Sequence, residues 1–412
     1  MSDLQVNLRS GNGAEIFINV RPNAVSITLD VETVYTFDRA GRLVIAVMEG
    51  RTYRRGLDNR MLAKWSEGPK GLSRQQRRLL NIQEARKVVE RVYGDVAALD
   101  CFVNRPSAGA APVPSDAAAC LDRIVSSGWT ALVEDAQKYA EVYLPVTILP
   151  PDQYLAVVLQ ATEGCSFNRC AFCSFYRDRP FRIKERAEFR RHMESVLGFF
   201  GEGISIRKSV FLADANAACI PRDNLLPMLD DINECMPMRS HADGGPLKGI
   251  YSFVDAFSER DGGARRYAEM RQRDVRRLYL GVESGCRELL RFLHKPQTPE
   301  QVRETILEIK DGGLDVGVIL MLGIGGHSFA ERHVQETLEL VNSLPWTSND
   351  LVFLSPFVEH ADMEYRRLAR EAGIRPLSSE EIECQFSALR DGIRSHTSCL
   401  RTALYGIEEF LY

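Results

Sequence analysis

The sequence has 412 residues, of which 45% are hydrophobic and 26% are charged. This balance is too polar for a membrane protein, and the length suggests roughly two or three domains, or fewer if one of them is a barrel. The formal net charge of -4 gives no overall field that would hold nucleic acid or an anionic membrane, so either partner would need a local patch. The start of the chain has no apolar segment typical of a signal peptide, and we expect a cytoplasmic protein with no membrane partner.

Residues 1–104 are expected to form a small β sheet followed by a basic amphipathic helix. Apolar and polar residues alternate between residues 14 and 53, and Asp38–Gly41 separates two alternating runs as a hairpin turn does. Residues 72–92 have apolar side chains at helical spacing and an arginine-rich opposite side, which predicts a helix. The stretch 51–91 holds twelve lysines or arginines against four acids, and its simplest interpretation is a solvated surface.

Residues 105–150 are expected to connect this region to the rest of the chain. The segment 105–119 is rich in proline, alanine and glycine, which indicates a linker or an exposed loop. After it, residues 118–126 and 130–143 have helical patterns.

From residue 151 the pattern changes to short apolar strands that alternate with charged helical segments. Strict alternation favours parallel strands with right-handed crossovers, so we expect an α/β fold, a partial (βα)6 TIM-like barrel at 151–360, and a helical tail at 361–412. In such folds the chemistry lies on the loops after the carboxyl ends of the strands. The strands are expected at 154–160, 209–214, 249–257, 277–283, 315–322 and 350–358, and the helices near 185–199, 222–234, 259–273, 299–311, 328–344 and 362–372.

Three cysteines, Cys165, Cys170 and Cys173, lie on the first of these loops, with four and then two residues between them. Thiolates at this spacing can converge on one metal centre. A structural zinc site prefers four ligands, commonly two pairs of cysteines, and no second C-x2-C pair is present. A plant-type ferredoxin cluster has the same spacing but needs a distant fourth cysteine, for which Cys219 could be nominated. Two further interpretations are a [4Fe–4S] cluster with one open iron site and three structural thiols that share a loop by chance.

With Phe172 directly before the last cysteine, this loop resembles that of the radical S-adenosylmethionine (radical SAM) superfamily, over about residues 150–360. The usual spacing there is C-x3-C-x2-C, so the longer first gap makes the subfamily uncertain. The resemblance implies a [4Fe–4S] cluster on the three cysteines, whose open iron binds S-adenosyl-L-methionine (SAM). It further implies reductive cleavage of SAM to a 5′-deoxyadenosyl radical, hydrogen abstraction from an unknown substrate, and an electron donor such as flavodoxin or ferredoxin.

The resemblance also implies SAM contacts at the ends of the later strands. Asp214 or Asn216 would replace the Gly-Gly-Glu motif that family members often carry, although an aspartate there also suits a helix cap. Glu283 also has an ordinary alternative, an ion pair with an arginine such as Arg277. The full set of implied cofactor-binding residues is Phe172, Asp214, Asn216, Glu283, Ser284, Lys295, Gly323, Ile324, Ser355 and Phe357.

Two other functions stay open. An RNA-modifying enzyme, with tRNA as substrate, could use the basic stretch 51–91, although few aromatic residues accompany it and no RNA-binding module is legible. A non-catalytic iron–sulfur electron-transfer protein would need a fourth thiolate. Cys384 and Cys399 are too few for an auxiliary cluster, so we predict one cluster only. The isolated cysteines are expected to be buried small residues: Cys101, Cys120, Cys219, Cys235, Cys286, Cys384 and Cys399.

Overall fold

The structure is a computed structural model that describes the chain except for residues 1–3, 10–14, 68–73, 104–113, 240–244 and 259–261. The chain divides into two compact units. The first comprises Met1–Val146, Glu194–Lys208 and Leu411–Tyr412, and the second comprises Thr147–Met193 and Ser209–Phe410. Within the described residues, no helix is both long enough and apolar enough to span a bilayer.

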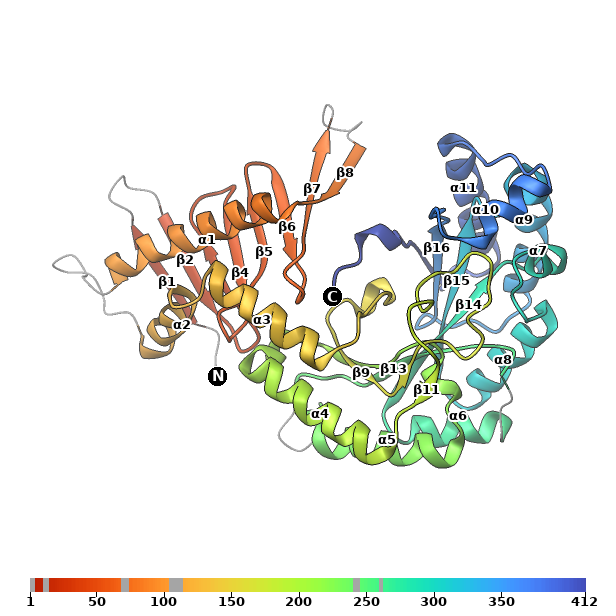
Figure 1. Cartoon of the computed structure of the whole chain (residues 1–412), viewed down its shortest axis with the longest axis horizontal. Helices are drawn as coiled ribbons and strands as arrows, with labels where there is room; N and C mark the ends of the chain where they lie inside the picture. The colour runs from red at the N-terminus through yellow and green to blue at the C-terminus, as the bar shows by residue number, and fades with distance from the viewer. Residues whose placement is uncertain (1–3, 10–14, 68–73, 104–113, 240–244, 259–261) are drawn as a thin grey trace. The chain divides into compact units, whose positions relative to one another are not determined.

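The first unit is built on an antiparallel sheet in which each described strand pairs with the next along the chain. Alternate residues point to opposite faces of a strand, and the apolar side chains of one face, such as Ile18, Ile27 and Tyr35, form the core. Helix α1 (Ile82–Val103) lies along this sheet in Figure 1 and contributes to the same core. The strands are β1 (Leu4–Arg9), β2 (Glu15–Val20), β3 (Val25–Thr28), β4 (Val34–Phe37), β5 (Leu43–Met48), β6 (Arg51–Arg55), β7 (Met61–Glu67) and β8 (Arg74–Leu79).

The expected hairpin turn at Asp38–Gly41 is confirmed. It joins β4 to β5, and the backbone N–H of Asp38 donates to the carbonyl oxygen of Arg42 at 3.0 Å. Gly41 has a φ of +88°, and a Cβ there would lie 2.8 Å from the carbonyl oxygen of Arg123. This turn therefore needs glycine for both its conformation and its close packing.

The helix expected over 72–92 is wrong in its first part. Residues 72–73 lie outside the described residues, β8 occupies Arg74–Leu79 and pairs with β7, and α1 begins only at Ile82. The cause is a capping box, in which the side chain of Asn81 accepts the backbone N–H of Glu84 at 3.0 Å and the Glu84 carboxylate accepts that of Asn81 at 2.9 Å.

The expected loop at 105–119 is also wrong at its end. Residues 104–113 lie outside the described residues, but α2 (Ser115–Val125) already begins at Ser115. The helices expected at 118–126 and 130–143 are confirmed as α2 and α3 (Trp129–Val142), and both belong to the first unit.

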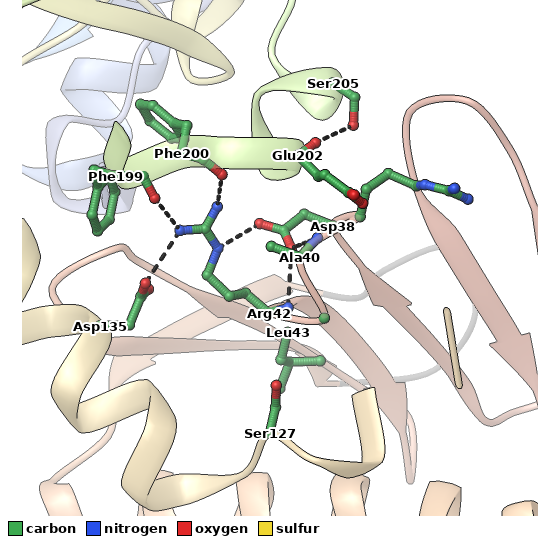
Figure 2. A network of polar contacts seen from close by, with 12 residues as sticks. Asp38, Ala40, Arg42, Leu43, Ser127, Asp135, Phe199, Phe200, Glu202 and Ser205 are labelled. Carbon is green, nitrogen blue, oxygen red and sulfur yellow. Dashed lines mark hydrogen bonds and ion pairs between the residues drawn. The ribbon is translucent and has the colours of Figure 1, made fainter. Parts of the chain in front are cut away.

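A buried arginine holds the end of helix α4 (Arg186–Phe200) within the first unit (Figure 2). The Arg42 guanidinium donates to Asp38 at 2.7 Å and to Asp135 at 3.2 Å. It also donates to the carbonyl oxygens of Phe199 and Phe200 at 3.1 and 2.8 Å. The last carbonyls of a helix lack partners within it, so Arg42 caps α4 while two carboxylates neutralise its charge.

The second unit contains a parallel sheet, and its described strands have the order β17-β16-β15-β14-β13-β12-β9. All six expected strands and the partial TIM-like barrel are confirmed; Figure 1 shows helices α5 to α9 outside the curved sheet. The strands are β9 (Ala156–Gln160), β12 (Ser209–Ala213), β13 (Ile250–Val254), β14 (Val275–Glu283), β15 (Asp315–Leu322), β16 (Leu351–Pro356) and β17 (Arg401–Leu404), with a small pair β10 (Thr162–Glu163) and β11 (Arg182–Ile183).

The alternating helices are confirmed too, although residues 259–261 of the one expected at 259–273 lie outside the described residues. The C-terminal tail contains two α helices, as expected, and also β17, which was not expected and which adds a seventh parallel strand beside β16. The helices are α5 (Arg222–Cys235), α6 (Gly263–Arg271), α7 (Arg287–Phe292), α8 (Pro299–Asp311), α9 (Gly326–Asn342), α10 (Glu364–Glu371) and α11 (Ser379–His396).

Candidate functional site

A cavity lies within the second unit, at the carboxyl ends of its strands. The loop after β9 contributes the three cysteines, and the loops or ends of the other strands contribute residues such as Asn216, Asp255, Glu283 and Ser355. Most of the lining is apolar or aromatic. A few polar groups within an apolar cavity are typical of a small-molecule site.

The cysteine loop brings all three thiols to this cavity. Cys165, Cys170 and Cys173 line it, and each is partly buried and free of disulfides. The backbone N–H of Asn168 donates to the Cys165 sulfur at 3.4 Å, and Asn168 has a φ of +45°. Hydrogen bonds from backbone N–H groups to cysteine sulfur are one way in which proteins tune iron–sulfur clusters.

The second half of the loop is fixed by two other elements through Ala171. Its backbone N–H donates to the carbonyl oxygen of Leu293, directly after α7, at 2.9 Å. Its carbonyl oxygen accepts the N–H of Tyr365 in α10, also at 2.9 Å. The Arg177 guanidinium adds a bond to the carbonyl oxygen of Cys170 at 3.0 Å. These main-chain bonds hold Cys170 and Cys173 at the cavity wall.

Burial governs the electrostatics of two of the thiols. It raises the pKa of Cys170 to about 12, against the opposing effect of Lys295, and it also raises the pKa of Cys173. Without a metal these two thiols stay protonated, so a bound cation is needed to keep them as thiolates. Three thiols on one cavity therefore fit a cysteine-bound cluster as a donor set. No three His, Cys, Asp or Glu side chains among the described residues gather around one metal ion; in a cluster, each cysteine binds a different iron.

A largely buried ion pair faces the cysteines. The Lys295 ammonium lies 3.1 Å from a Glu283 carboxylate oxygen and 5.9 Å from the centre of the Phe172 ring. Burial acts to lower the pKa of Lys295, but attraction to Glu283 outweighs it, and the pKa is raised above its ordinary value. The alternative pairing of Glu283 with Arg277 is wrong, because Arg277 binds Asp152 at 2.9 Å.

Three more of the expected residues line the cavity: Asn216, Ser355 and Phe357. The Asn216 amide donates to Asp255 at 2.8 Å. Asp255 lines the cavity as well and was not expected. Its carboxylate also accepts the backbone N–H of Phe257 at 3.0 Å. The signal was present, since Asp255 is an acid at the carboxyl end of the third expected strand.

Four expected residues do not line the cavity, although all lie among the described residues. Asp214 is buried beneath the cysteine loop and accepts from Gln160 at 3.0 Å. Ser284 is fully buried, and its hydroxyl accepts the N–H of Cys286 at 2.9 Å. Gly323 donates its N–H to a side chain of α11, and Ile324 packs in an apolar cluster behind the site. That these four residues contact SAM stays a prediction, and their positions away from the cavity lining do not favour it.

The remaining cysteines lie apart from this loop. Cys219, nominated as a fourth ligand, ends a short 3-10 helix at Ala217–Cys219 and does not line the cavity. Cys120 and Cys286 are buried as expected. Cys219 and Cys235 are only partly buried, and Cys384 and Cys399 are exposed, so the expectation that the isolated cysteines are all buried is wrong for these four. The side chain of Cys101 lies outside the described part of the chain.

One part of the chain matches the model of a known family. Residues 159–341 match the family model described as the radical SAM superfamily. No curated protein matches the chain. Among solved structures, coproporphyrinogen III oxidase (HemN) from Escherichia coli is 14% identical, with a TM-score of 0.42, over 66% of this chain and 57% of that chain. HydG, a maturase of the [FeFe]-hydrogenase, is also 14% identical, with a TM-score of 0.40, over 79% of this chain and 67% of that chain.

The cobalamin-dependent S-adenosylmethionine radical enzyme OxsB is 16% identical, with a TM-score of 0.37. The match covers 55% of this chain, and this chain spans only 30% of OxsB. The family model itself begins within β9 and ends within α9. It therefore includes the cysteine loop and the Glu283–Lys295 pair, and of the first unit it includes only Glu194–Lys208.

Proposed function

We propose, from the premise that this chain belongs to the radical SAM superfamily, that Cys165, Cys170 and Cys173 hold the cluster of that family. The chain is an enzyme, and its cofactors are a [4Fe–4S] cluster and SAM. The observation that supports the assignment is that all three thiols line one cavity at the carboxyl ends of the parallel strands. With three cysteines as ligands, one iron is left open, as a catalytic metal requires.

The proposed reaction is hydrogen abstraction from a substrate within this cavity. When bound and reduced, the cluster supplies the electron that cleaves SAM to a 5′-deoxyadenosyl radical. The chain's own part is to bind, to orient and to exclude water, which suits a cavity walled by rings such as Phe167, Phe257 and Phe357. The substrate and the final outcome, whether oxidation, methylation, rearrangement or sulfur insertion, are left open.

SAM carries an ammonium, a carboxylate, two ribose hydroxyls and an adenine ring, and the cavity offers a partner for each. Lys295 is a buried cation suited to the carboxylate, while Glu283 and Asn216 present acceptors to the ammonium or the hydroxyls. Phe357, with Ser355 beside it, provides an aromatic face for adenine. Phe172 supports Lys295 from within the cysteine loop.

Single cysteine substitutions test the ligand set. We expect anaerobically reconstituted protein to hold about four irons per chain, and Cys165→Ser, Cys170→Ser and Cys173→Ser each to lose most of them. Cys219→Ser is the matched control and should keep the full iron content. Iron analysis and electron paramagnetic resonance of the reduced protein provide the readout. An equal loss of iron in Cys219→Ser would favour a four-cysteine cluster. A wild-type protein that binds only zinc would contradict the proposal.

Cleavage of SAM tests the reaction itself. Reduced holoprotein with SAM should form 5′-deoxyadenosine, measured by chromatography, and the three cysteine variants should form none. Iron-loaded protein that binds SAM without cleaving it under strong reduction would contradict the proposed chemistry.

The RNA-modifying alternative gains no specific support from the basic stretch. Arg60, Arg78 and Arg86 form ion pairs with acids on the same surface, at 2.5, 2.9 and 2.7 Å. Arg91 pairs with Glu49. We therefore do not extend the proposal to RNA. The electron-transfer alternative is not retained, because it needs a fourth thiolate and Cys219, the nominated ligand, does not line the cavity.

A further inference from the structure

The backbone turns sharply where β14 delivers Glu283 to the cavity. Glu283 has a φ of +62°, and the N–H of Ser284 donates to the carbonyl oxygen of Val282, two residues back, at 2.7 Å. The pairing of β14 with β15 shifts register between Gly281 and Glu283. A γ-turn with a side chain in the left-handed region is unfavourable on its own. It persists only where surrounding groups hold it.

Those groups come from helix α9, behind the cavity. The Ser284 hydroxyl lies 2.7 Å from Nδ1 of His333, and the N–H of Gly285 donates to the Thr337 hydroxyl at 2.8 Å. Ser284, His333 and Thr337 are all fully buried. A Cβ on Gly285 would lie 2.3 Å from the carbonyl oxygen of Glu336, so the chain presses directly onto α9.

The hydrogen bond between Ser284 and His333 does not depend on one tautomer of the ring. Burial lowers the pKa of His333 to about 4, so its ring is neutral near pH 7. The Ser284 hydroxyl accepts the N–H of Cys286, and it can donate its own hydrogen to Nδ1 or accept a hydrogen from Nδ1 with its second lone pair. Either arrangement fixes the Ser284 side chain to α9.

We propose that His333 is a positioning residue that, through Ser284, holds the turn that points Glu283 at Lys295 in the SAM cavity. His333 does not itself line the cavity. The inference rests on the proposed function only in its last step, the binding of SAM, because the hydrogen bonds that hold the turn involve no cofactor. Thr337 supports the same turn one residue further on.

Hydrogen exchange tests the turn without any cofactor. We expect the amides of residues 284–286 to exchange about tenfold faster in His333→Leu, which removes the partner of the Ser284 hydroxyl, than in wild type. His333→Asn is the conservative rescue, because its side-chain amide can accept from or donate to Ser284 in place of Nδ1, and it should restore slow exchange. Thr305→Val is the matched control: Thr305 is another buried side chain of this unit, on α8, whose hydroxyl donates to the carbonyl oxygen of Gln301 at 2.6 Å. It should lower stability without changing exchange at 284–286.

SAM binding tests the consequence. In reconstituted protein kept oxidised, the Kd for SAM should rise about tenfold in His333→Leu and stay near wild type in His333→Asn and Thr305→Val, at equal iron content. Unchanged exchange in His333→Leu would overturn the inference, and so would faster exchange with an unchanged Kd. A wild-type protein that binds no SAM would count against the proposed function instead, while exchange would still decide whether His333 holds the turn.

Discussion

Gly281 leaves the space that the Glu283–Lys295 pair occupies. A Cβ at this position would lie 2.5 Å from the Glu283 carboxylate and 3.2 Å from the Lys295 ammonium. Gly281→Ala should therefore displace the pair and weaken SAM binding about tenfold, at unchanged iron content. Gly94→Ala in α1 is the control, since nothing lies within 4 Å of its Cβ. Equal Kd values for the two variants would mean that the pair has no part in binding SAM.

His333 should also make stability depend on pH. The unfolded histidine takes up a proton below about pH 6.5, whereas burial lowers the folded pKa to about 4. The unfolded state therefore binds more protons in this window, and stability falls as the pH falls. The free energy of unfolding of wild type, relative to His333→Asn, should drop by about 2 kcal/mol between pH 7 and pH 5. Urea titrations of both proteins at the two pH values measure this drop. If wild type and His333→Asn differ by the same free energy of unfolding at pH 7 and pH 5, His333 is not buried in its neutral form.

At the scale of elements, the end of α4 depends on one side chain. Arg42 is 8% exposed and joins two carboxylates to two carbonyls of the last helical turn. Arg42→Ala removes the cation that neutralises Asp38 and Asp135, and it also removes the cap of the helix. We therefore expect the free energy of unfolding, measured by urea titration, to fall by about 3 to 5 kcal/mol. Arg86→Ala, which breaks the exposed pair with Glu90 on α1, should change stability little. A small effect of Arg42→Ala would show that the network is dispensable.

Element boundaries show where sequence reasoning stops. The six strands of the second unit were predictable because buried parallel strands, such as β15, read as continuous apolar runs. β17 was not predictable, because its residues are mostly exposed and it lies at the edge of the sheet, where it pairs with β16 alone. β8 was mistaken for helix because RQQRRL runs into an apolar pattern with helical spacing. The Asn81–Glu84 capping box was legible in the sequence and marks the true start of α1.

At the scale of the whole molecule, chain order predicts which loops meet but not which side chains face inward. The cysteines and Glu283 were found because alternating strands and helices bring the strand ends to one side of the sheet. Ser284, expected beside SAM, does not line the cavity. It follows Glu283 directly, yet the turn sends its hydroxyl toward α9 instead. That direction depends on a φ angle and on a histidine 49 residues away, neither of which a local pattern contains.

The two backbone hydrogen bonds of Ala171 explain how the loop accommodates the unusual spacing of its cysteines. The backbone N–H and carbonyl oxygen of Ala171 bond to Leu293 and Tyr365. These bonds fix the position of the Cys170–Cys173 segment and do not involve the residues before it. The stretch from Cys165 to Cys170 bends separately, at the left-handed Asn168. An extra residue in that stretch can thus be accommodated locally, while two of the three proposed iron ligands, Cys170 and Cys173, stay in place.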